Sequence, residues 1–129
     1  PLAAQSIDLI YLLAPTTTKE RSKEIVKVAS GFLYYVSLKG ITGADHFDSV
    51  EVTRKVKELK ELTDLPICVG FGIKDGETAK KIAPYADGIV VGSAFVDLVA
   101  KGGSPSEISA RLKEKASELR VAIDSTKVS

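Results

Sequence analysis

The sequence predicts an α/β fold made of four β-strand and α-helix units with parallel strands, and two observations lead to it. Short apolar runs alternate with amphipathic segments along all 129 residues. Glycine-bearing turns follow three of the apolar runs, at residues 40–43, 70–72 and 92–93. Strands that alternate with helices imply a parallel sheet with right-handed crossovers.

The predicted strands are short apolar runs, several of them rich in β-branched and aromatic residues, which favour a pleated surface. Ala14-Pro15 ends the first run, and Pro66 opens the third. The four expected strands are Ile7 to Leu13, Phe32 to Val36, Ile67 to Val69, and Gly88 to Val91.

The predicted helices lie between and after these strands and show apolar residues at spacings of three and four. The first is capped by the threonines at 16–18 and runs to Ser30, before Gly31. The others are expected at 50–63, at 75–83, from Ser93 to the Gly102-Gly103 break, and from Ser104-Pro105 onward. We expect residues 1–129 to form one partial domain, with a frayed tail at 125–129.

Two architectures suit this order: an open doubly wound sheet, or part of a TIM (β/α)₈ barrel. A complete barrel has about 250 residues, close to twice this chain, so the (βα)₄ pattern would be half of one. The glycine turns sit at strand C-terminal ends, where barrel enzymes keep their sites. The first strand ends in Ala14-Pro15, without the G-x-G-x-x-G turn of a dinucleotide fold.

Composition narrows the function classes. The formal net charge is +1, with charges of both signs alternating along the predicted helices, which argues against nucleic-acid binding. The apolar runs are far shorter than the roughly 18 residues of a membrane helix. A single cysteine, Cys68, fits a reducing cytoplasm and is expected to be a small buried hydrophobe. Because the chain contains no methionine, we expect it to be a piece of something longer.

The turn Gly92-Ser93 predicts a phosphate site. It joins the last strand directly to an apolar helix, and a helix N-terminus offers unpaired N–H groups and a positive dipole end. Gly92 would let a ligand approach the backbone, and Ser93 could cap the helix or donate its hydroxyl to an anion. A plain strand-to-helix turn is the alternative interpretation.

Four segments resemble the tryptophan synthase alpha subunit. Residues 31–43 (GFLYYVSLKGITG) resemble its strand 6 and loop 6, and residues 66–73 (PICVGFGI) its strand 7. Residues 87–94 (DGIVVGSA) are similar to its strand 8, and residues 10–15 (IYLLAP) to its strand 5. The chain therefore looks like the C-terminal half of that barrel, strands 5 to 8.

The resemblance implies a lyase of tryptophan biosynthesis that cleaves indole-3-glycerol phosphate into indole and glyceraldehyde 3-phosphate. The family works as a heterotetramer with a pyridoxal-phosphate beta subunit, and the alpha subunit itself needs no cofactor. Its catalytic Glu and Asp belong to the N-terminal half. This chain would supply no catalytic residue and would be inactive alone.

The resemblance also implies substrate-binding residues. Gly43, Gly72, Gly92 and Ser93 match phosphate ligands, and Thr42 matches a loop-6 residue that helps close the site. Tyr34 matches a strand-6 tyrosine at the active site, near the substrate and the catalytic carboxylate, with a core aromatic as the alternative. Leu12 and Phe71 match residues that line the indole pocket, although a role in the hydrophobic core fits them nearly as well. Since neighbouring strand residues point to opposite faces, we expect Tyr34 to face the site and Tyr35 to pack under the helices.

Two other functions stay open. The chain could be a phosphate-binding half-barrel module without turnover, pairing with an N-terminal half or with a second copy of itself. It could also belong to another sugar-phosphate barrel enzyme, although the 40–43 loop argues against this. Lys39 is read as a solvated loop lysine, and His46 has no evident partner for catalysis. No metal site is expected.

Overall fold

The computed structural model describes residues 1–37, 49–70, 73 and 75–126. These residues form one four-stranded parallel sheet in the order β1-β2-β3-β4. The strands are β1 (Tyr11–Leu13), β2 (Leu33–Val36), β3 (Ile67–Gly70) and β4 (Gly88–Val90). The predicted parallel α/β order is confirmed.

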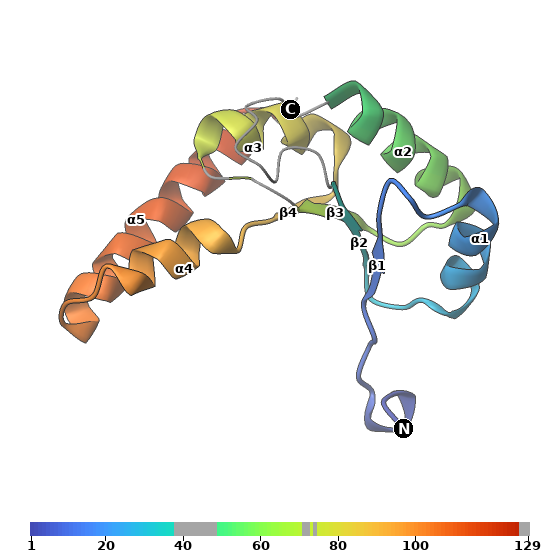
Figure 1. The fold of residues 1–129 in the computed structure, drawn as a ribbon, viewed down its shortest axis with the longest axis horizontal. Helices are drawn as coiled ribbons and strands as arrows, with labels where there is room; N and C mark the ends of the chain where they lie inside the picture. Colours follow the sequence, from blue (N-terminus) through green and yellow to red (C-terminus); the bar gives the residue numbers. More distant parts are fainter. Residues whose placement is uncertain (38–48, 71–72, 74, 127–129) are drawn as a thin grey trace.

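Five α-helices and two short 3₁₀-helices complete the described fold. The α-helices are α1 (Lys19–Val28), α2 (Ser49–Leu62), α3 (Gly76–Ile82), α4 (Ser93–Ala100) and α5 (Pro105–Asp124). The 3₁₀-helices are η1 (Ala3–Gln5) and η2 (Ala83–Tyr85). In Figure 1 the helices form an arch around one side of the sheet, and the N-terminal segment and the α4–α5 pair extend from its two ends.

Side-chain oxygens cap the N-termini of three of these helices. Thr18 Oγ1 accepts a hydrogen bond from the Arg21 N–H at the start of α1. Asp75 does the same for Thr78 at the start of α3. Ser104 and Glu107 form a reciprocal capping box at the start of α5, with Pro105 in the first turn. These contacts satisfy amides that a helix leaves without an internal acceptor.

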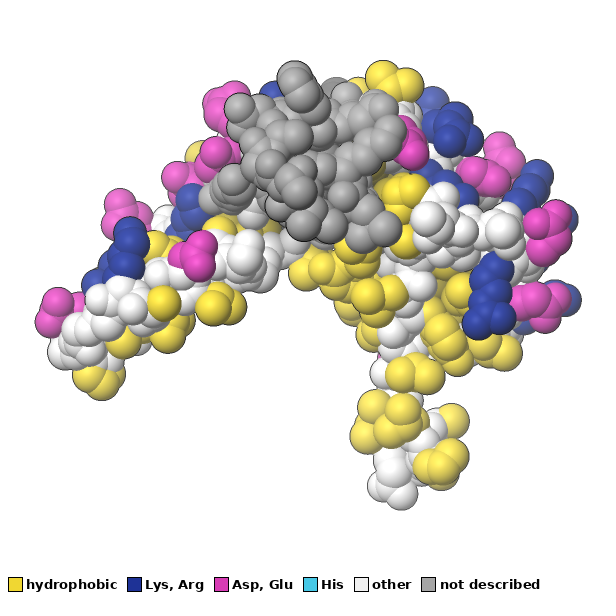
Figure 2. All heavy atoms as spheres, viewed as in Figure 1, with side chains coloured by type: hydrophobic (Ala, Val, Ile, Leu, Met, Phe, Trp, Pro, Cys, Tyr) yellow, Lys and Arg dark blue, Asp and Glu magenta, His cyan; other side chains and the backbone are white. Residues whose placement is uncertain are grey.

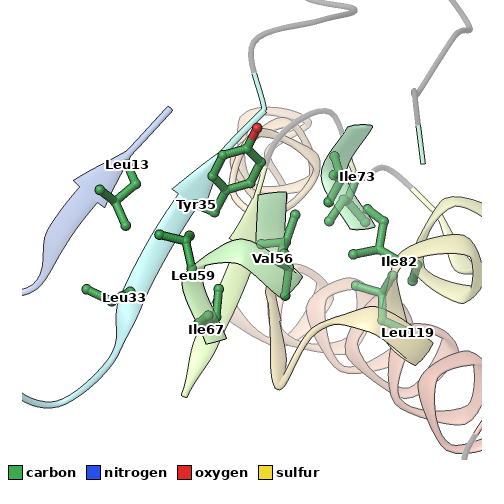
Figure 3. Packing of buried hydrophobic residues seen from close by; sticks show 12 residues of the cluster. Leu13, Leu33, Tyr35, Val56, Leu59, Ile67, Ile73, Ile82 and Leu119 are labelled. Atoms are coloured by element: carbon green, nitrogen blue, oxygen red, sulfur yellow. The ribbon is translucent and has the colours of Figure 1, made fainter. Parts of the chain in front are cut away.

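The core lies between the sheet and the arch of helices (Figure 3). Leu13, Leu33, Tyr35, Ile67 and Val69 point from the strands into it, and each is fully buried. The helices supply Val52, Val56, Leu59, Ala79, Ile82 and Leu119. The opposite face of the sheet therefore carries the alternate residues of each strand.

The first predicted strand was too long. Residues 7–10 are not in a strand, and β1 begins only at Tyr11, where it pairs with Leu33 of β2. Ile7 and Leu9 are about half exposed. An apolar run forms a strand only where a neighbouring strand is present, and β2 does not extend back far enough to pair with residues 7–10.

The last two helices pack against each other, and one arginine also links them by hydrogen bonds. The Arg111 guanidinium on α5 donates to the carbonyls of Leu98 and Gly102, which lie at the end of α4 and in the following turn. Gly102 and Gly103 both have positive φ angles, as expected for the predicted break. Arg111 therefore joins the C-terminal end of α4 to α5.

Candidate functional site

A row of side chains crosses the open face of the sheet. Leu12 pairs in register with Tyr34, Tyr34 with Cys68, and Cys68 with Gly88. Leu12 is 63% exposed, whereas Leu13, its neighbour on the core side, is fully buried. The row brings together two of the predicted substrate-binding residues, Leu12 and Tyr34, as cross-strand partners.

Tyr34 and Tyr35 point to opposite faces of the sheet, as predicted. Tyr35 is fully buried under the helices, and burial raises the pKa of its hydroxyl to about 12. Tyr34 lies on the open face and is partly exposed. Its hydroxyl occupies the space above Gly70, because a Cβ built there would lie 2.5 Å from the Tyr34 oxygen. Glycine at 70 is therefore what lets the Tyr34 ring lie across the face.

Cys68 is not the buried hydrophobe that the sequence predicted. It lies on the open face, partly exposed, with its Sγ 2.8 Å from where a Cβ of Gly88 would be. The prediction was wrong because an apolar strand has two faces, and the helices cover only the face of Ile67 and Val69. Burial, together with the Asp87 carboxylate, raises the pKa of the thiol, so the neutral form is favoured.

Gly92 follows β4 and is the N-cap of α4. Its φ of −116° is accessible to any residue, and a Cβ added there would meet no atom within 4 Å. Neither backbone strain nor packing among the described residues requires a glycine. Phe95 and Val96 donate their N–H groups to the Gly92 carbonyl, so the helix begins at once. The amides of its first turn have no acceptor within the helix.

The other predicted ligands lie outside the described residues. They are Thr42, Gly43, Phe71 and Gly72, together with the loop residues Lys39 and His46. Their proposed roles stay predictions. The described residues bring together only Leu12 and Tyr34, with Gly92 and Ser93 following β4, two strands from β2.

Sequence reasoning missed the glycines that shape the open face. Gly70 and Gly88 each face a side chain of the neighbouring strand, Tyr34 and Cys68 respectively. The available signal was their position: a glycine inside or at the start of a strand often marks close approach of another group. Among the described residues, no group of three His, Cys, Asp or Glu side chains could hold a metal ion. Within the same part of the chain, no helix is long and apolar enough to span a bilayer.

The fold alone assigns this chain to a structural class of protein. Four parallel strands in sequential order, with helices along one side and an open inner face, make one half of a closed (β/α)₈ barrel. The Gly92-Ser93 turn stands at the C-terminal end of the last strand, which is the end where barrels carry their sites.

Comparison with known proteins gives the family. The family model described as tryptophan synthase alpha chain matches residues 1–124. The alpha chain from Halorhodospira halophila is 43% identical over 122 residues, and that from Burkholderia cenocepacia is 45% identical over 123. The structure of tryptophan synthase subunit alpha from Campylobacter jejuni has a TM-score of 0.76 and 38% identity, covering 88% of this chain and 46% of that one.

The chain belongs to the tryptophan synthase alpha chain family. The match to each of these two relatives includes 95% of this chain. The same match spans only 45% of the relative's own length. This chain likewise covers 46% of the Campylobacter jejuni structure, so it corresponds to about half of a barrel.

Proposed function

We propose that this chain forms the phosphate-binding half, and part of the indole pocket, of a lyase that cleaves indole-3-glycerol phosphate to indole and glyceraldehyde 3-phosphate. Its place would be tryptophan biosynthesis in the cytoplasm, with a beta subunit as partner for the indole. The family membership supports the reaction. The geometry of the Gly92 turn supports the phosphate role.

The single observation that carries the proposal is the glycine at position 92. Its conformation suits any residue, and the space around its missing side chain is open. A residue chosen only to build the turn would not need to be glycine. A ligand that must approach the backbone amides of α4 would need it, because a side chain would stand in the way.

Tyr34 and Leu12 would contribute to the indole pocket. Both lie on the open face, paired across β1 and β2, and present an aromatic ring and an aliphatic side chain to the same space. A flat aromatic ligand binds well against such side chains. Phe71, Thr42, Gly43 and Gly72 would complete the pocket and the phosphate contacts, as the family resemblance implies.

The chain would not perform the cleavage alone. The reaction needs a proton delivered to the indole ring and another removed from the glycerol hydroxyl, and each such transfer contributes on the order of 10²-fold or more. In the family, the carboxylates that do this belong to the other half of the barrel. This half would bind and orient the substrate.

Phosphate binding tests the proposal directly. Calorimetry of the full chain with glycerol 3-phosphate should show binding that Gly92→Asp weakens at least tenfold, because the added carboxylate repels the anion. Ser106→Asp is the matched control: it places the same charge in the first turn of α5 and should leave binding unchanged. Equal loss in both variants, or no binding by the wild-type chain, would contradict the phosphate assignment.

A further inference from the structure

The helix α4 carries the amides that the proposed phosphate site needs, and its main packing partner among the described residues is α5. Figures 1 and 2 show the two helices as an arm that projects from one end of the arch. The end of α4, the link to α5 and the start of α5 form the tip of this arm. The direction of the first turn of α4 therefore depends on how the two helices are joined.

The link between the two helices contains two glycines in unusual conformations. Gly102 and Gly103 have φ angles of 75° and 110°. Glycine reaches such angles without a steric cost, but it also leaves the backbone free to adopt many others. The backbone of the link alone therefore does not hold α4 in one position against α5.

The side chain of Arg111 supplies a restraint at this point. Its Nη2 donates to the Leu98 carbonyl, at 3.2 Å, and to the Gly102 carbonyl in the link. Leu98 lies in the last turn of α4, where carbonyls lack an N–H partner within the helix and where a cation suits the negative end of the dipole. The helix that carries Arg111 is itself anchored, because Leu119 and Ala122 of α5 are buried.

The surroundings of Arg111 show that its planar head is enclosed. Its Nε is buried and has no hydrogen-bond partner among the described residues. A buried donor without an acceptor lowers stability, so this arrangement is not the best one for stability alone. The guanidinium is held where it reaches the two carbonyls, and its rigid plane limits how far these can move apart.

We propose that Arg111 is a positioning residue for the phosphate site, which it serves by holding α4 in the direction that its first-turn amides need. The ligand follows from the proposed function, on which this inference rests. Arg111 would not touch the phosphate, since Leu98 lies five residues, or about 8 Å along the helix axis, beyond Ser93. A helix that pivots at its far end misdirects its N-terminal N–H groups, and a misdirected hydrogen bond weakens steeply.

Calorimetry of the full chain with glycerol 3-phosphate tests the proposal. Arg111→Met keeps the length of the side chain and removes its donors, and it should raise the dissociation constant at least fivefold. Arg111→Lys should stay within about threefold of the wild type, because one nitrogen makes both hydrogen bonds and an ammonium group can replace it. Arg120→Met is the matched control: it removes the same charge from the same helix, at an arginine that pairs with Asp124, and should leave binding unchanged.

Amide hydrogen exchange without ligand separates a local role from a general loss of stability. In Arg111→Met, the amides of α4 should exchange at least tenfold faster than in the wild type, whereas those near Leu119 in α5 should change little. Equal acceleration in both helices, or unchanged exchange in α4, would overturn the proposal. If Arg111→Met does not fold by circular dichroism, Arg111→Gln, which is shorter and keeps a donor, takes its place in both measurements.

The two proposals fail in different ways. A wild-type chain that binds no glycerol 3-phosphate would contradict the proposed function, and with it the role of Arg111 at this site. A wild-type chain that binds the ligand, together with an Arg111→Met variant that binds it equally well, would overturn only the role of Arg111. Equal weakening by Arg120→Met would also overturn it, because the effect would then come from the lost charge.

Discussion

Neighbouring residues on one strand have opposite surroundings, and this decides their chemistry. Tyr35 lies in the core, where burial raises the pKa of its hydroxyl to about 12; the Glu51 carboxylate adds to the rise and Arg54 opposes it. Tyr34, one residue earlier, lies on the open face above Gly70. The first is a structural residue, and the second is available to a ligand.

The pKa of Tyr35 predicts a loss of stability at high pH. Below pH 10 the hydroxyl is neutral in both the folded and unfolded chains and contributes no pH dependence. Between pH 10 and about 12 the unfolded chain ionises first, so the free energy of unfolding should fall, by on the order of 2 kcal/mol.

Urea unfolding at pH 9 to 12 measures this effect. Tyr35→Phe cannot ionise and serves as the control, because every other group titrates equally in both proteins. As the pH rises through this window, the free energy of unfolding of the wild type should fall relative to that of Tyr35→Phe. A constant difference would show that the hydroxyl is not kept neutral by the fold.

At the scale of single elements, capping residues decide where several helices begin. Asp75 accepts hydrogen bonds from both the N–H and the hydroxyl of Thr78, and the N–H bond lowers the pKa of its carboxyl most. The helix that it caps, α3, supplies Ala79 and Ile82 to the core and packs against α5. The cap therefore supports the packing between the sheet and the last helix.

Removing this cap should destabilise the fold. Asp75→Ala should lower the free energy of unfolding at pH 7 by about 1 kcal/mol, whereas Asp75→Asn should keep most of it because the amide oxygen still accepts. Since the folded-state pKa is lowered, the wild-type advantage over Asp75→Ala should shrink as the pH falls below about 4. Thermal unfolding at pH 7 and pH 3 would detect this; equal stability of wild type and Asp75→Ala at pH 7 would count against it.

The positions of the elements were largely predictable from the sequence, because hydrophobic period and turn residues act locally. The four strands and the capped helices begin within a few residues of the expected positions. The exception is the segment 7–10, which was predicted as strand. Whether it forms one depends on a neighbouring strand to pair with, and a local sequence pattern does not contain that information. The exposure of Cys68 was unpredictable for a related reason: it depends on which face of the sheet the helices cover.

The candidate site was predictable in part. The alternation of Tyr34 and Tyr35 gave the correct faces, and the Gly92-Ser93 turn does begin a helix. The close contact between Tyr34 and Gly70 depends on strand register, which the sequence does not state. The roles of Thr42, Gly43, Phe71 and Gly72 stay predictions, since these residues lie outside the described ones.

At the scale of the whole molecule, the described residues form an α/β core on one side of the sheet and leave the other side open. The core holds the strands and α2, α3 and α5 together. Leu12 on the open face, the segment that leads into β1, and α4 leave apolar side chains exposed. Whatever completes the barrel must cover these surfaces, and in the relatives that the chain matches, more than half of the length lies outside the matched region.

Indole release from indole-3-glycerol phosphate, measured with a complex of this chain and the N-terminal half of the Halorhodospira halophila alpha chain, tests the proposed function. Co-elution first establishes that the two halves have assembled. We expect turnover by the complex and none by either half alone. Gly92→Asp, but not Ser106→Asp, should lower kcat/KM at least tenfold. Turnover by the isolated 129-residue chain, or an assembled complex that binds substrate and never cleaves it, would contradict the proposed function.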